Sequence, residues 1–184
     1  MMSTDEPDLI RRAQSDPRAF GPLYDRYVGR IYAFLYRRTG DEALAQDVTA
    51  AAFEKALRGL PRFRWQGVSF GAWLYRIARH ELAQTFRRER TTEPLLDWHV
   101  LDEPGAAGRR SPNGREEALH AAFGRLSDAD RELLTLRFFE DLSSAATAEV
   151  LGCSVNAVYV RVHRALERLR AELAHVERQE AEHA

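Results

Sequence analysis

The chain of 184 residues is 45% hydrophobic and 30% charged, with a formal net charge of −1 at pH 7, which allows one ordinary domain or two small ones. No run of about 18 apolar residues occurs, so a membrane-spanning or membrane-inserted protein is excluded. The near-neutral sum hides two basic blocks, 58–90 and 154–170, which are separated by the acidic stretch 91–107. Such blocks are typical of nucleic-acid binding, although solvated helix faces also produce them.

Residues 16–90 are predicted to form one helical domain, preceded by a short N-terminal segment, 1–15. An acidic cap followed by proline starts the first helix, and apolar residues then recur at three- and four-residue steps. The expected helices cover 17–40, 42–59 and 70–88, with a loop over 60–68. Because each helix has one apolar face, the three can bury one another's faces.

Residues 91–115 differ in character from what precedes them. They contain three prolines and three glycines and show no sustained helical period, which indicates a flexible acidic linker. A second helical unit is expected over 116–176, followed by a short tail, 177–184. No alternating strand pattern occurs, so the predicted fold is all-α, with an N-terminal helical bundle and a C-terminal helix-turn-helix domain joined by the linker.

The strongest local pattern is a helix-turn-helix over 143–170. Ser143 caps a short helix, Gly152 permits a left-handed turn, and Ser154 caps a long helix with a one-sided apolar stripe that begins at Val155. The opposite face offers side chains suited to base edges and phosphates in a DNA groove. The candidate DNA-binding residues are Ser154, Asn156, Tyr159, Val160, Arg161, His163, Arg164 and Arg168. The alternative is a helical hairpin whose basic face binds nothing.

A second nucleic-acid pattern lies in the first domain, where arginines alternate with aromatic residues in a loop and along the helix after it. Aromatic rings suit the stacking of unpaired bases, and arginines suit their phosphates. The candidate residues are Arg62, Phe63, Arg64, Trp65, Trp73, Arg76, Arg79, His80 and Arg87. Core packing of Phe63, Trp65 or Trp73 is the alternative interpretation.

Taken together and in order, the motifs of the chain resemble the extracytoplasmic-function (ECF) branch of the bacterial sigma-factor family. The resemblance covers roughly residues 16–174. It is carried by Asp47-Val48-Thr49 with Phe53, by the run from Phe70 to Arg79, by Leu126 to Leu134, by Leu142-Ser143, by Ala148 to Gly152, and by Ser154-Val155 with Arg161 to Ala165. The joint order of these motifs is far more specific than any one of them.

The resemblance implies a promoter-recognition subunit of RNA polymerase. The first domain would bind the clamp coiled coil of core polymerase through Asp47, Val48 and Phe53. The 61–68 loop and the helix after it would open and hold the −10 element, and the helix-turn-helix would bind the −35 element as duplex DNA. A further implied partner is an anti-sigma protein, and the chemistry of transcription would remain with the polymerase.

The sequence departs from the family pattern at several positions. In the polymerase-binding helix of the family, acidic and glutamine side chains usually flank and follow the aspartate, and here those positions hold Gln46, Ala50 and Ala51. His80 stands where asparagine is common, and Tyr159-Val160 replaces a basic residue followed by serine. Thr147 replaces an apolar residue, which should loosen the helix-turn-helix packing slightly.

Other classes of function fit the sequence less well. A self-sufficient helix-turn-helix regulator needs a dimerisation surface for paired half-sites, and a protein that only sequesters a partner needs no base-stacking loop. No cluster of acid, base and nucleophile appears, and no histidine or cysteine spacing is typical of zinc, so neither an enzyme nor a cofactor is expected. The single cysteine, Cys153, and the acidic N-terminus, 1–8, are typical of a cytoplasmic protein.

Overall fold

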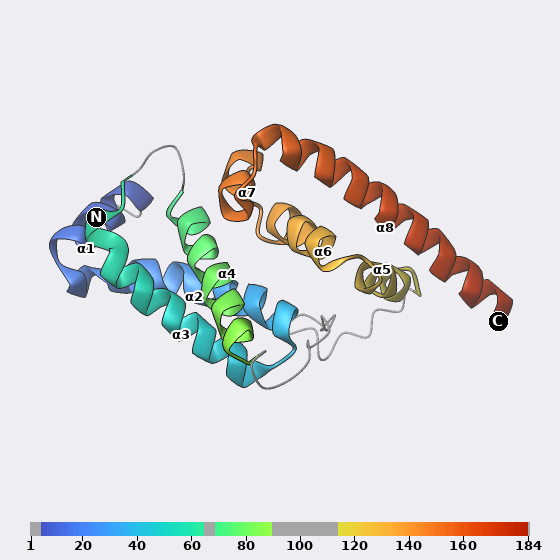
Figure 1. The fold of residues 1–184 in the computed structure, drawn as a ribbon, viewed down its shortest axis with the longest axis horizontal. Coiled ribbons are helices and arrows are strands. Elements are labelled where there is room, and N and C mark those ends of the chain that lie inside the picture. The colour runs from blue at the N-terminus through green and yellow to red at the C-terminus, as the bar shows by residue number, and fades with distance from the viewer. Residues whose placement is uncertain (1–4, 65–68, 90–113, 184) are drawn as a thin grey trace.

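The computed structural model of the chain describes residues 5–64, 69–89 and 114–183, and within these ranges it contains helices and no strand (Figure 1). The helices are α1 (Glu6–Ser15), α2 (Gly21–Thr39), α3 (Glu42–Gly59), α4 (Phe70–Glu89), α5 (Gly114–Gly124), α6 (Asp128–Leu134), α7 (Ser144–Leu151) and α8 (Val155–His183). Short helical turns occupy η1 (Pro17–Phe20), η2 (Leu60–Arg62) and η3 (Thr135–Phe139). The all-α prediction is confirmed, while the linker prediction falls mostly on residues 90–113, outside the described ranges.

The three helices predicted for the first unit are present, and the residues expected at their boundaries begin or end them. Gly40 follows α2 with a φ of 67°, a left-handed conformation that glycine adopts without strain. The Asp41 carboxylate accepts a hydrogen bond from the Leu44 backbone N–H at 3.0 Å and caps α3. The Ser69 hydroxyl does the same for the Ala72 N–H at the start of α4, at 3.1 Å.

The core of the first unit lies where α2, α3 and α4 meet. Phe34, Phe70 and Tyr75 are completely buried there, and the Phe34 and Tyr75 rings meet edge to face with centroids 5.3 Å apart. Gly71 lets α4 approach α2 closely, because a Cβ atom at this position would lie only 2.8 Å from the Tyr27 ring. The position of α4 therefore depends on a small residue near its beginning.

Helix α1 was not predicted, because residues 1–15 were interpreted as a terminal segment. It begins with Glu6 and Pro7, which suit the first turn of a helix. It buries Leu9, Ile10 and Ala13 against the core of the first unit. With ten residues, it is too short to give a strong periodic signal by itself.

The second unit contains the predicted helix-turn-helix, formed by α7 and α8. The hydroxyls of Ser127, Ser143 and Ser154 each accept a hydrogen bond from the backbone N–H three residues later, at 3.1–3.2 Å. Gly152 adopts a φ of 67° between the two helices, as the sequence predicts. Helix α5 begins two residues before the expected boundary of the unit at Glu116.

The inner face of α8 follows the predicted stripe with one exception. Val158 and Ala165 are completely buried against α6 and α7, and Leu166 and Leu169 are half-buried. Val155, expected to begin the stripe, is 40% exposed because it stands at the open end of the helix. Beyond the stripe α8 continues to His183, past the tail boundary expected near residue 177.

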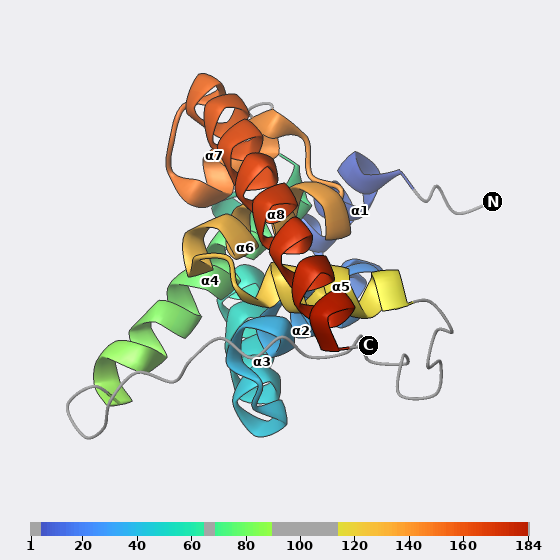
Figure 2. The same cartoon turned by 90° about the vertical axis from the view of Figure 1, so that its right-hand side faces the viewer.

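The two units are in contact, which the sequence did not predict. Figures 1 and 2 show α7 beside α4, with α8 on the far side of the second unit. Four buried residues of the second unit belong to the same apolar cluster as the α2–α4 core; they are Leu136, Leu142, Ala146 and Val150. The expected separation of two tethered modules is therefore not the arrangement of this structure.

Replacing Thr147 with valine is expected to raise the free energy of unfolding by about 1 kcal/mol, measured by urea denaturation. Thr147 is completely buried in α7, and its hydroxyl has no hydrogen-bond partner among the described residues. Thr49→Val is the matched control, because the buried Thr49 hydroxyl donates to the Ala45 carbonyl at 2.7 Å. Equal effects of the two substitutions would contradict the explanation.

Candidate nucleic-acid interface

The N-terminal half of α8 presents an exposed face with both apolar and polar side chains. Tyr159 is 62% exposed and Val160 is 43% exposed, on the side of the helix opposite the buried Val158. Asn156 and Arg164 are also exposed on this half of the helix. Large apolar side chains that remain in water beside polar ones are typical of a surface that meets a partner.

The charged residues of this face differ in what holds them. Arg164 has no ion-pair or hydrogen-bond partner among the described residues, so its guanidinium is available to a ligand. His163 lies 3.3 Å from the Glu167 carboxylate one turn later. Arg168 donates to Asp130 at 3.0 Å, which ties α8 to α6. Of these three residues, Arg164 is the one best placed to reach DNA.

Two other predicted DNA contacts have structural roles here. Ser154 uses its hydroxyl as the N-terminal cap of α8, which orients the first turn of the helix. The half-buried Arg161 places a guanidinium nitrogen 4.0 Å from the Cys153 sulfur and thus lies against the turn. Both residues therefore stabilise the start of α8 and the turn before it.

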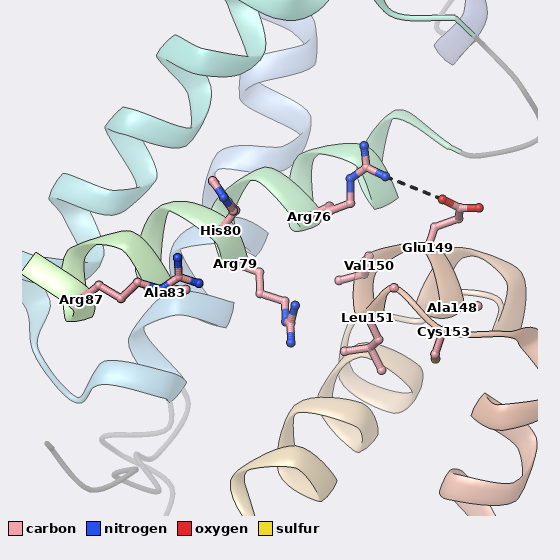
Figure 3. Close-up of a pocket in the computed structure, with 11 residues that line it drawn as sticks. Arg76, Arg79, His80, Ala83, Arg87, Ala148, Glu149, Val150, Leu151 and Cys153 are labelled. Carbon is pink, nitrogen blue, oxygen red and sulfur yellow. Dashed lines mark ion pairs between the residues drawn. The ribbon is translucent and has the colours of Figure 1, made fainter.

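In the first unit, basic side chains follow one another along α4. Arg76, His80 and Arg87 are exposed, and the Arg79 side chain is 41% exposed. Figure 3 shows Arg76 and Arg79 extending from α4 toward α7, with His80 and Arg87 farther along the helix. Arg76 lies 3.8 Å from Glu149 and Arg79 lies 2.9 Å from Glu132, so acidic groups of the second unit already contact part of this basic row.

The aromatic candidates divide between core and surface. Phe63 is only 8% exposed and its ring lies 4.9 Å from that of Trp73, so it fills the end of the core instead of offering a face to a base. The structure therefore contradicts its predicted stacking role and supports core packing. Trp73 is half-buried, with one end of its ring over Gly59. Trp65 lies outside the described residues.

A hollow of about 280 Å³ lies beside the start of the loop. Its walls include the exposed Arg62 and Arg64, Trp73, Arg76 and, from α7, the acidic Glu149. An aromatic wall with three guanidinium groups around it suits a nucleotide, which presents a flat base and an anionic phosphate.

Gln14 of α1 positions this loop, a role that no sequence pattern predicts. Its side-chain amide donates to the backbone carbonyls of Leu60 and Phe63 at 3.0 and 2.8 Å. These two bonds fix the chain just before the exposed Arg64. Only the glutamine's place on an unpredicted helix reveals this role, because no sequence motif includes it.

Helix α3 carries the residues predicted to bind polymerase, and only one of them is accessible. Asp47 is exposed, together with its neighbours Gln46 and Ala50. Val48 and Phe53 are 3% and 4% exposed, so in this structure they belong to the core. Their predicted role is corrected to that of holding the exposed Asp47 face of α3 in place.

The described residues contain no group of three or more histidine, cysteine or acidic side chains arranged to hold a metal ion. Among the same residues, no helix is both long and apolar enough to cross a membrane.

Two family models match the chain, one on each of the two helical units. Residues 23–92 match the model of sigma-70 region 2, and residues 116–169 match that of sigma-70 region 4. The protein belongs to the sigma-70 family, in its ECF group. As an ECF sigma factor, it directs core RNA polymerase to promoters for the initiation of transcription.

The similarity of this sigma factor to known proteins extends over most of its length. It is 38% identical over 174 residues to the ECF sigma factor BldN of Streptomyces coelicolor, which covers 88% of this chain and 63% of BldN. It is 35% identical over 181 residues to the sigma-H factor of Pseudomonas aeruginosa, covering 90% and 93% of the two chains. Its fold matches that of CnrH, in a complex with the cytosolic domain of CnrY, with a TM-score of 0.64 at 27% identity over 94% of this chain and 98% of CnrH.

Replacing Gln14 with alanine is expected to lower the free energy of unfolding by about 1–2 kcal/mol, because the carbonyls of Leu60 and Phe63 each lose one of their two donors. It should also speed tryptic cleavage after Arg62 and Arg64, since the start of the loop is no longer held. Gln46→Ala is the matched control: among the described residues this exposed amide bonds only to Glu42, so the change should stay within about 0.5 kcal/mol. Unchanged proteolysis in the Gln14 variant would contradict the positioning role.

Proposed function

We propose that two surfaces of this sigma factor share promoter recognition. The exposed face of α8 binds the −35 element as duplex, and the start of the 61–68 loop with α4 holds the opened −10 element. The observation that carries the proposal is the set of large side chains and an unpaired arginine at the beginning of the second helix of the helix-turn-helix. Such a helix enters the major groove with its N-terminal residues foremost.

The side chains of α8 suit direct readout of base edges. The Arg164 guanidinium has the geometry for two parallel hydrogen bonds to a guanine, and Val160 offers methyl groups to a thymine methyl. The Asn156 amide suits an adenine edge. The hydrogen bond of Arg168 to Asp130 keeps α8 in a fixed position on α6 while the exposed face meets DNA.

The −10 surface combines stacking with charge. Arg62, Arg64 and Arg76 surround the hollow beside Trp73, which suits a base that has left the helical stack. Arg79, His80 and Arg87 extend the basic row along α4 for the backbone of the separated strand. Trp65 belongs to this surface in the proposal on the strength of its place in the loop sequence.

The polymerase-binding surface of the proposal is the exposed side of α3. Asp47 supplies its charge, and the buried Val48 and Phe53 hold the helix against α2 and α4. The clamp coiled coil of core polymerase is the expected partner.

An anti-sigma protein is the second protein partner that we propose. CnrH, whose fold this chain shares, forms a complex with the cytosolic domain of another protein, and this supports a similar association here. The proposal also assigns the chain a cytoplasmic location and no catalytic activity of its own, since the polymerase carries out the chemistry.

Reconstituted transcription tests the proposed function. Core polymerase with this protein should initiate from a genomic promoter library, and the active templates should share a −35 and a −10 element. Core enzyme that remains silent on the whole library, or tight duplex binding by the protein alone with no effect on core enzyme, would overturn the assignment.

Replacing Arg164 with alanine is expected to weaken recognition of the −35 element by about 1–3 kcal/mol, because a bidentate base contact is lost. Holoenzyme binding to promoters that differ at single −35 positions measures the loss. One position should lose its discrimination, while Arg170→Ala, at an exposed site farther along α8, should leave the discrimination intact. An equal loss on every duplex would assign Arg164 to a phosphate instead.

Replacing Asp47 with alanine is expected to weaken binding to core polymerase about tenfold, or by about 1.4 kcal/mol. The variant should fold normally, because the carboxylate is exposed on α3. Asp25→Ala, which removes an exposed carboxylate from α2, is the control. Binding measured by competition for labelled core enzyme should separate the two variants, and equal affinities would exclude the proposed α3 surface.

A further inference from the structure

The contact between the two units buries apolar surface from both. Leu136 and Leu142 lie before α7 and Val150 lies within it, and each is less than a tenth exposed. All three belong to the apolar cluster whose centre is the α2–α4 core. Because apolar surface leaves water when these residues meet the first unit, the contact is favoured in the free protein.

A buried carboxylate at this contact gathers partners from two helices of the first unit. Glu140, at the end of η3, is 3% exposed. Its two oxygens lie 3.1 Å from the Arg37 guanidinium and 3.4 Å from that of Arg30, both on α2. The phenol of Tyr75 on α4 donates to the same carboxylate. Burial, reinforced by the charge of Glu140, raises the pKa of Tyr75, so the phenol keeps its proton and remains a donor.

A second buried carboxylate engages the proposed −10 surface directly. Glu132 of α6 is 4% exposed, and one of its oxygens lies 2.7 Å from Arg38 and 2.9 Å from Arg79. The contact with Arg38 is an ion pair by distance without the alignment of a hydrogen bond. Nearby, Glu149 of α7 lies 3.8 Å from Arg76. Carboxylates of the second unit thus occupy cations that would otherwise meet the phosphates of the −10 strand.

The contact is not closely packed along its whole length. A cavity of about 430 Å³ lies between α4 and the C-terminal end of α7, and Figure 3 shows Arg79 and Arg87 on one side of it and Leu151 and Cys153 on the other. A partly hollow contact with many charges resembles interfaces between domains that separate, more than a permanent core.

The two DNA-binding surfaces lie closer together in this structure than the two elements of a promoter do. The two promoter elements are centred about 25 base pairs apart, which is about 85 Å of duplex at ~3.4 Å per pair. In the structure, α4 touches α7, and the recognition helix begins only a turn after α7 ends. The two DNA-binding surfaces therefore cannot reach both elements of one promoter until the units separate.

We propose that the contact between the units is an autoinhibitory lock of the free sigma factor. Glu132 and Glu140 hold the lock closed, and Glu132 with Glu149 covers the −10 surface by substituting for phosphates. The exposed faces around Asp47 and Arg164 remain accessible, so the closed protein can still meet polymerase and duplex DNA. This inference rests on the proposed assignment of α4 to the −10 element.

Neutralising the two buried carboxylates tests the lock in the full chain. In Glu132→Gln/Glu140→Gln the side chains keep their size but lose the charges that hold four arginines. Small-angle X-ray scattering should show the radius of gyration rising by about 3 Å or more as the compact pair of units opens. Glu117→Gln/Glu177→Gln changes the net charge equally at exposed positions of α5 and α8 and should leave the radius unchanged.

The same two variants test whether opening uncovers the −10 surface. Without polymerase, Glu132→Gln/Glu140→Gln should bind a fluorescent single-stranded DNA of about 12 nucleotides about fivefold more tightly than Glu117→Gln/Glu177→Gln does. The reason is that opening releases Arg76 and Arg79 from their carboxylate partners. Equal affinities in the two variants would show that added charge alone increases binding, and the proposed masking would be wrong.

Arg37→Gln/Arg38→Gln removes two of the three arginine partners on α2 and leaves Arg30 in place. It replaces the first variant if circular dichroism shows that the first variant fails to fold. A similar rise in the radius of gyration supports the lock. An unchanged radius in a folded variant, or an already extended wild type, overturns it. These outcomes can be told apart from a failure of the proposed function. If scattering refutes the lock but the wild-type holoenzyme still initiates transcription, the sigma-factor assignment remains intact.

Discussion

The relation between the two halves of this protein depends on how two buried carboxylates are neutralised. Glu132 and Glu140 come from a single stretch of the second unit, and their partners come from α2 and α4 of the first. A carboxylate removed from water is costly unless cations and donors surround it, and here both requirements are met across the contact. The same ionic interactions that position the units therefore also determine which arginines of α4 remain available to DNA.

The acidic residues that bring the net charge close to zero include three that pair with arginines of the first unit. Basic residues of α2 and α4 and the acidic residues Glu132, Glu140 and Glu149 neutralise each other in the closed form. Arg164 on α8 stays unpaired among the described residues. Charged pairs at a partly hollow interface define how the two units fit together more than they stabilise the contact, because water and DNA phosphates can replace each partner. The protein can thus be compact when free and still present cations to a promoter.

The residues near the sites show how core and function share one sequence. Phe63, Val48 and Phe53 looked like contacts because they lie within functional motifs, yet each supports an exposed neighbour from below. A sequence motif contains both exposed contact residues and buried supporting residues, because losing a supporting side chain also disturbs the surface above it. Burial separates the two roles, and burial depends on which helix face turns inward, a property that a short aromatic loop does not reveal.

The sequence by itself determined the helices, their caps and the helix-turn-helix. These follow from local rules: serine and aspartate caps, glycine at positive φ, and apolar residues at helical spacing on one face. It also indicated both nucleic-acid surfaces, because clustered arginines and aromatics are local as well. Only the tertiary structure decided that α1 forms and holds the loop through Gln14, that Phe63 is core, and that Glu132 and Glu140 join the two units. Each of these features depends on contacts between residues that are distant in the chain. The packing of several helix faces together brings those residues into contact, and the periodicity of the sequence does not predict it.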